Sequence, residues 1–217
     1  MSRKYPKSGD IRRRGAKFAP RALVIAVCEG ENTEPRYLKA FSAEHGNQLI
    51  EVVVIGAAGV PGSVVDRAIE EKKRAEKEAR RSKNSFDKLF EVWAIFDVDT
   101  HPNIENAKNK ARTHGVKLAI SNPCIELWGI FHLSDHDRPD DGAELQRKLH
   151  KLMPNYDKDR GKSFDYELMR PNYETAKRRS VASCKKRREE ANLGGNPSTD
   201  IHELLDTIIK NGVKAFS

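Results

Sequence analysis

Short apolar runs alternate with longer mixed segments along the first half of the chain. Each run is almost continuously apolar and rich in β-branched residues, which is typical of strands buried on both faces of a sheet. The four predicted strands cover residues 23–27, 50–55, 89–96 and 116–120. Between them, capping residues, glycine stops and helical periodicity predict helices that begin near Asn32, Ser63 and Asn103. We therefore expect an α/β, Rossmann-like fold with a mostly parallel four-stranded sheet flanked by helices.

After residue 121 the pattern becomes helical. Amphipathic or apolar segments predict helices over residues 125–133, 143–153 and 172–190, and a last helix from Asp200 to Gly212. The chain then divides into a basic, mobile N-terminal arm (1–20), an α/β core (21–122) and a mainly helical extension packed on the core (123–217).

Charge is distributed unevenly along the 217 residues, whose net charge is +8 at pH 7. Most of the excess lies before residue 22, where eight basic residues, among them Arg12, Arg13 and Arg14, accompany a single acid. Such an arm commonly contacts phosphate backbones, although it can also serve only as a solubilising tail. Three separated cysteines, and no apolar run long enough to span a bilayer, predict a reduced cytoplasmic protein without a membrane segment.

Acidic residues directly follow two of the predicted strands. Glu29 and Glu31 flank Gly30 after the first strand, and Asp97 and Asp99 follow the third. Because the carboxyl ends of parallel strands meet at one edge of a sheet, these side chains should lie close together. Clustered carboxylates repel each other unless a cation neutralises them, and Mg²⁺ and Mn²⁺ prefer oxygen ligands. The sequence therefore predicts a divalent-metal site, where Gly30 would let the backbone approach the ion or a phosphate.

Three blocks of the chain resemble the RloB-like family: CEGENTEPRYLKAF (28–41), FDVDT (96–100) and SNPCIELWGIFH (121–132). The resemblance runs from about Arg12 to Leu205. That family is placed among Toprim-domain, metal-dependent nucleases of prokaryotic defence loci, so the resemblance implies a Toprim-like fold with a helical C-terminal extension. In Toprim proteins a Glu–Gly pair follows the first strand and Asp-x-Asp follows the third. The resemblance thus implies catalytic, metal-binding roles for Glu29, Asp97 and Asp99.

Other residues are candidates for supporting or catalytic roles. Glu31 is expected beside the metal ligands, and Glu34 only as an acid that complements the N-terminus of its helix. His101 follows the second acidic pair and could contact phosphate. Glu126 lies inside an apolar run, which is costly for a carboxylate unless it has a partner. It therefore belongs either to the catalytic site or to a salt bridge with a buried arginine. Related Toprim nucleases of the overcoming-lysogenization-defect type carry a late catalytic lysine, and that resemblance makes Lys177 a candidate.

Basic residues crowd the predicted helix over residues 172–190. We expect this helix to bind nucleic acid through Arg178, Arg179, Lys185, Lys186, Arg187 and Arg188. His132 and His136 are four residues apart and, with neighbouring aspartates, could bind a metal. Surface positions are the favoured interpretation for both histidines.

The predicted function is hydrolysis of phosphodiester bonds in DNA or RNA, tRNA included, with Mg²⁺ or Mn²⁺ as cofactor, in bacterial anti-phage defence. Backbone contacts do not distinguish DNA from RNA. Nucleic acid is the expected partner, and a defence-system ATPase or a homo-oligomer would hold the nuclease inactive in healthy cells. One alternative is a nucleic-acid- or partner-binding module whose acidic site is inert. A less favoured one is a haloacid-dehalogenase-like phosphatase, which also places Asp-x-Asp after a strand.

Overall fold

A computed structural model of the protein describes residues 22–45, 50–54, 60–82, 88–98, 103–156 and 161–212. The predicted basic arm lies outside the described residues, and with it Arg12, Arg13 and Arg14. Asp99 and His101 lie outside them as well.

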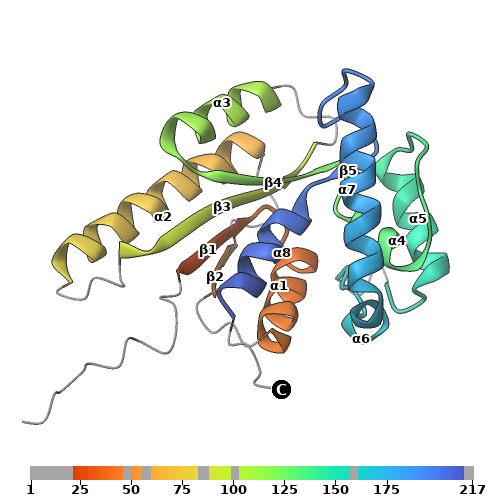
Figure 1. Ribbon diagram of the computed structural model, residues 1–217, viewed down its shortest axis with the longest axis horizontal. Coiled ribbons are helices and arrows are strands. Elements are labelled where there is room, and N and C mark those ends of the chain that lie inside the picture. The colour runs from red at the N-terminus through yellow and green to blue at the C-terminus, as the bar shows by residue number, and fades with distance from the viewer. Residues whose placement is uncertain are drawn as a thin grey trace, which may run out of the picture.

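The described residues form a five-stranded sheet of order β2-β1-β3-β4-β5 (Figure 1). Its strands are β1 (Leu23–Cys28), β2 (Ile50–Val54), β3 (Phe90–Asp97), β4 (Lys117–Asn122) and β5 (Ser198–Thr199). The first four strands pair in parallel, which confirms the predicted four-stranded parallel sheet and the α/β class. This arrangement is consistent with a Toprim-like fold. The two-residue strand β5, which pairs antiparallel with β4, was not predicted.

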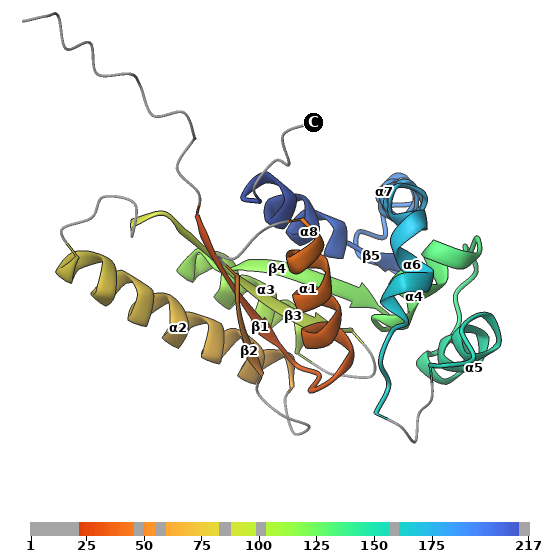
Figure 2. The same ribbon diagram turned by 90° about the horizontal axis from the view of Figure 1, so that it is seen from below.

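Each face of the sheet carries its own apolar core. In β1, Val24, Ala26 and Cys28 contribute to one core, while Ile25 and Val27 contribute to the other, because successive side chains point to opposite faces. The first core is covered by α1 (Thr33–Glu44) and α8 (Ile201–Lys210), and the second by α2 (Pro61–Arg81) and α3 (Ile104–His114) (Figure 2). The continuous apolar runs of the sequence thus arise from burial on both sides.

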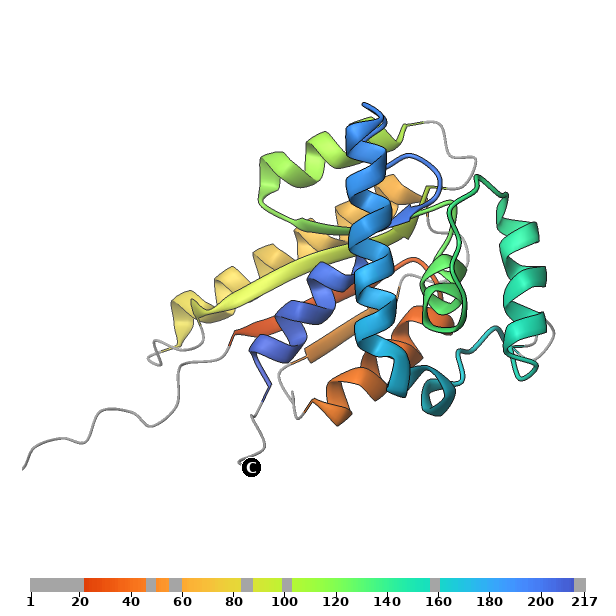
Figure 3. The same ribbon diagram turned by 45° about the vertical axis from the view of Figure 1, so that its right-hand side comes forward.

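The remaining helices gather beyond the ends towards which β3 and β4 run (Figure 3). They are α4 (Glu126–Leu133), α5 (Gly142–Leu152), α6 (Tyr166–Met169), the short 3₁₀ helix η2 (Arg170–Asn172) and α7 (Tyr173–Glu189). Helix α4 is buried over Glu126–His132, since it packs against both α5 and α7. None of the helices in the described ranges is both long and apolar enough to cross a lipid bilayer.

The C-terminal part of the chain returns to the sheet through β5. The Ser121 and Thr199 hydroxyls lie 2.8 Å apart in a buried hydrogen bond, and the Asp200 carboxylate accepts the backbone N–H of Ile120. Two residues of backbone pairing carry no hydrophobic periodicity, so the sequence pattern could not reveal this strand.

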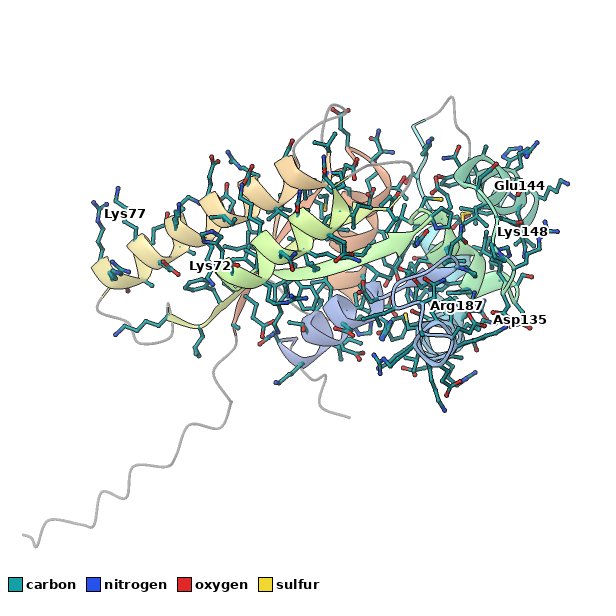
Figure 4. The ribbon with its side chains drawn as sticks, turned by 90° about the horizontal axis from the view of Figure 1, so that it is seen from above. Lys72, Lys77, Asp135, Glu144, Lys148 and Arg187 are labelled. Carbon is teal, nitrogen blue, oxygen red and sulfur yellow. The ribbon has the colours of Figure 1, made fainter. Side chains whose placement is uncertain are left out.

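A lysine of α2 caps the C-terminal end of α3. Lys72 Nζ donates to the carbonyl oxygens of His114 at 2.6 Å and of Gly115 at 3.0 Å (Figure 4). Gly115 ends the helix with a left-handed φ of 61°, as the sequence predicted. The cation also complements the negative end of the helix dipole.

Candidate functional site

A pocket of about 720 Å³ lies where β1 and β3 end. Glu29 follows the last residue of β1, and Asp97 is the last residue of β3. The described residues lining the pocket are mostly polar or acidic and come from four places: the strand ends, the start of α1, the start of α4, and an outer wall. They are Glu29, Gly30, Glu31, Asn32, Thr33, Glu34, Asp97, Cys124, Ile125, Glu126, Asp141, Gly142, Ala143, Gln146, Gly161 and Lys162.

The parallel pairing of β1 with β3 brings Glu29 to Asp97. Cys28 and Ile95 are partners in the register, and the backbone N–H of Glu29 donates to the Ile95 carbonyl at 3.1 Å. The backbone N–H of Asp97 in turn lies 3.4 Å from Glu29 Oε2 and donates to it. The two acids that the sequence placed at neighbouring strand ends therefore line one pocket. Asp99, the third predicted ligand, lies outside the described residues.

Glu34 lines this pocket as well, although we predicted only a helix-terminal role for it. It sits in the first turn of α1 with 6% of its surface exposed. Its pKa is raised to about 7, first by burial and then by the charges of Glu126 and Glu29. A hydrogen bond from its own backbone N–H opposes this rise. Its position on the first helical turn after the strand end is the signal that could have identified it.

Gly30 makes room for that carboxylate. A Cβ on Gly30 would lie 2.3 Å from Glu34 Oε2 and 2.9 Å from its Cδ, closer than non-bonded atoms approach. A backbone hydrogen bond from Gly30 also stabilises the ionised form of Glu34. The glycine after the first strand is therefore required for close approach, as predicted, but the group that approaches it here is a side chain of the protein.

Asp97 is surrounded by the other carboxylates. Its pKa is raised well above the ordinary value, first by burial and then by the charges of Glu34 and Glu126, with a smaller contribution from Glu29. A backbone hydrogen bond from Ile125 opposes this shift. The neighbouring carboxylates thus disfavour the ionisation of Asp97 and Glu34, which is the electrostatic condition that a bound cation relieves.

Glu126 opens α4 and has an exposed fraction of 3%. In the described part of the chain its partner is not a buried arginine but the Tyr156 hydroxyl, which donates to Glu126 Oε1. The pKa of Tyr156 is raised by burial and then by Glu126, so this phenol remains a hydrogen-bond donor. The structure therefore favours a position of Glu126 at the pocket over a salt bridge with a buried arginine.

The donor set fits Mg²⁺ or Mn²⁺, because Glu29, Glu34, Asp97 and Glu126 offer only carboxylate oxygens. Within the described ranges, no three histidine, cysteine, aspartate or glutamate side chains are close enough to enclose an ion. The carboxylates would therefore have to draw together around a cation. Glu31 and Gly30 line the same pocket.

Lys177 is not among the residues that line the acidic pocket. Its Nζ lies 2.5 Å from Asp206 Oδ1, which joins α7 to α8. This position does not support the catalytic role that the resemblance suggested for Lys177. The described lysine at the pocket is Lys162, whose carbonyl accepts the Thr33 hydroxyl and whose φ is 42°.

The basic helix α7 is in part a structural element. Arg179 donates to the Phe131 carbonyl at 2.7 Å and pairs with Asp135, while Lys186 and Arg187 both pair with Asp137. Arg187 is only 5% exposed, so its predicted contact with nucleic acid is wrong for this conformation (Figure 4). These cations hold the segment between α4 and α5 against α7.

The other predicted nucleic-acid contacts on α7 are exposed. Arg178 donates to Thr175 Oγ1 at 2.9 Å, Lys185 pairs with Glu189 at 3.7 Å, and Arg188 lies at the surface. These residues remain available as predicted contacts with a phosphate backbone.

The two histidines that were expected at the surface are buried instead. His132 lies under α1, its Nδ1 is 2.9 Å from the Trp128 carbonyl oxygen, and burial lowers its pKa to about 4. Burial also lowers the pKa of His136, whose Nδ1 lies 3.1 Å from Lys148 Nζ. Both are neutral packing residues, and neither lines the acidic pocket.

Comparison with known families agrees with these features. The profile described as RloB-like protein matches residues 24–208, which is most of the chain. The chain belongs to the RloB-like family. The match spans the strands from the second residue of β1 onward and all the residues that line the acidic pocket, so the resemblance seen in the three sequence blocks extends over most of the described fold. No curated protein and no solved structure is significantly similar to the chain.

Proposed function

We propose that this RloB-like protein is a divalent-metal-dependent nuclease that hydrolyses phosphodiester bonds. The observation that carries the proposal is the convergence of Glu29, Glu34, Asp97 and Glu126 on one pocket at the carboxyl ends of β1 and β3. A structural role does not account for the crowding of acids that raises the pKa of Asp97 and of Glu34, whereas a cation site does.

The residues would share the work as follows. Glu29 and Asp97, together with Asp99, would hold Mg²⁺ or Mn²⁺, with Glu34 approaching from the first turn of α1. When bound, such an ion stabilises charge on a scissile phosphate and lowers the pKa of a bound water. Glu126, whose Oε1 is fixed by the Tyr156 hydroxyl, would orient the attacking water or the substrate from the wall of the pocket.

The substrate and the setting follow from charge and family. The net charge of +8 supports binding of a polyanion, and the outer wall of the pocket carries Lys162 and Gln146, which can contact a phosphate backbone. We propose DNA or RNA as substrate and anti-phage defence in the bacterial cytoplasm as the role, with an ATPase partner or self-association as the control. Family membership also favours this proposal over a haloacid-dehalogenase-like phosphatase.

The decisive experiment is cleavage of plasmid DNA, single-stranded DNA and tRNA with Mg²⁺, Mn²⁺ or EDTA. Wild type is compared with Glu29→Gln/Asp97→Asn, and Glu78→Gln, an exposed acid on α2, is the matched control. Metal-dependent cleavage that is lost in the double variant and kept in the control is the expected result. Binding of nucleic acid by all three proteins, with no cleavage under any condition, would favour the binding module with an inert acidic site.

A further inference from the structure

A second cavity lies at the β4 edge of the sheet. It has a volume of about 430 Å³, and its lining residues come from the β4 segment, from α3 and α7, and from the chain between Leu193 and Glu203. It shares no lining residue with the acidic pocket. We call it the edge groove. Its lining residues include three apolar side chains of the β4 segment, three cations and the exposed Leu193.

The edge groove exposes sheet edge that β5 leaves uncovered. β5 pairs only with Ser121 and Asn122, and the next outward position, Ile120, is paired with Asp200 through both its N–H and its carbonyl. Alternate residues of a parallel strand direct their backbone groups to the same neighbour, so Leu118 also faces outward. Within the described residues, the outward N–H and C=O of Leu118 have no hydrogen-bond partner. The edge can therefore accept one further extended residue.

The floor of the edge groove is apolar. Val116, Leu118 and Ile120 line it, and the last two are only partly buried against α2 and α3. Leu193, in the loop before β5, borders the groove with 73% of its surface exposed. A strongly exposed leucine beside partly buried aliphatic side chains indicates a surface that an apolar side chain of a partner would cover.

The rim of the edge groove is cationic. Lys108 and Arg112 approach from α3, and Arg188 approaches from α7. Lys108 pairs with Glu105 at 2.8 Å, but that glutamate is largely exposed, and such surface pairs exchange partners at little cost. Two acids also line the groove. Burial raises the pKa of Asp200 to about 7, so its repulsion is weakened at neutral pH, which leaves Glu203 as the main opposing charge.

We infer that the edge groove binds an extended segment of a partner protein in which an apolar residue is flanked by aspartate or glutamate. Its backbone would pair with Leu118 and its apolar side chain would cover the floor beside Leu193. Its acids would meet Arg112 and Arg188. This is recognition by strand addition, in which backbone pairing supplies affinity and side-chain pockets supply specificity. A phosphate ligand would leave the Leu118 carbonyl unpaired and would face Glu203, so the peptide is the better match.

The test is selection of nine-residue peptides from a random displayed library against the full chain. The selected sequence is then made as a fluorescent peptide, together with its Lys-for-Asp/Glu counterpart. Binding is measured by anisotropy for wild type, Arg112→Glu/Arg188→Glu, Leu193→Ser, and the control Lys185→Glu. The control reverses an exposed charge on α7 that does not line the groove. Inorganic tripolyphosphate is titrated as a competitor.

We expect enrichment of acidic–apolar sequences, with affinity lowered about tenfold or more by the double charge reversal, lowered by Leu193→Ser, and unchanged in the control. Hydrogen exchange at the Leu118 amide should slow when the peptide binds. Enrichment without acids, or equal binding by the double variant, would overturn the inference. Displacement of the peptide by tripolyphosphate without slowed exchange at Leu118 would also overturn it, because the groove would then recognise phosphate.

Discussion

Gly30→Ala is the sharpest probe of the acidic pocket. The new Cβ would lie 2.3 Å from Glu34 Oε2, whereas a carbon and an oxygen in contact lie about 3.3 Å apart. The Glu34 carboxylate must therefore move by about 1 Å, and a displacement of that size in a catalytic constellation can cost about 100-fold in rate. We expect metal-dependent cleavage to fall by that order.

The same substitution should change stability little. The displaced carboxylate loses part of a hydrogen bond from Gly30 that is worth about 1.5–3 kcal/mol when fully formed, because one partner is a carboxylate. Replacing glycine by alanine returns about 0.4–1 kcal/mol by restricting the unfolded chain. The free energy of unfolding, measured with urea, should thus decrease by about 1 kcal/mol or less while activity is largely lost.

Gly62→Ala is the matched control. This glycine lies in the first turn of α2, and a Cβ there would meet no atom within 4 Å. It should gain about 0.5–1 kcal/mol of stability and keep full activity. Full cleavage by Gly30→Ala, with a metal response like that of wild type, would refute the assignment of Glu34 to the catalytic pocket.

Three further outcomes follow from the same structure. Glu34 has a folded-state pKa of about 7, above its unfolded value of 4.5, so it makes stability fall as pH rises through that window, by up to about 3 kcal/mol. Glu34→Gln should remove most of that fall in urea unfolding with EDTA at pH 5 and pH 8, and a pH dependence like that of wild type would argue against a buried, repelled carboxylate. Tyr156→Phe removes the hydroxyl that donates to Glu126 and should cost about 1–3 kcal/mol as well as activity, whereas unchanged stability would show that the pair is not formed. Arg187→Ala should destabilise the protein by about 2 kcal/mol without weakening nucleic-acid binding. Arg178→Ala should weaken nucleic-acid binding without destabilising the protein. Thermal unfolding measures the first effect and filter binding the second.

The apolar runs were sufficient to predict the four parallel strands, and their order of appearance brought Glu29 and Asp97 to one edge. The strands can be predicted because a strand buried on two faces must be apolar at nearly every position. The shared edge can be predicted because parallel strands end on the same side of a sheet. The family could also be identified from its three blocks, since each block is a contiguous stretch of sequence. By contrast, β5 has only two residues and depends on Ser121 and Asp200 for its place, so it carries no periodic signal.

The roles of individual charges were decided by the tertiary structure. Glu34 looked like an ordinary helix-terminal acid, and only the tertiary fold brought it close to Asp97 at the end of β3 and to Glu126 at the start of α4. Lys177 was a candidate catalytic lysine and Arg187 a predicted nucleic-acid contact, but Asp206 and Asp137 come to them from distant segments. The sequence by itself determined which residue types end each strand. Whether a charge meets solvent, substrate or another charge depends on which segments fold beside it, because electrostatic energies change with distance and burial.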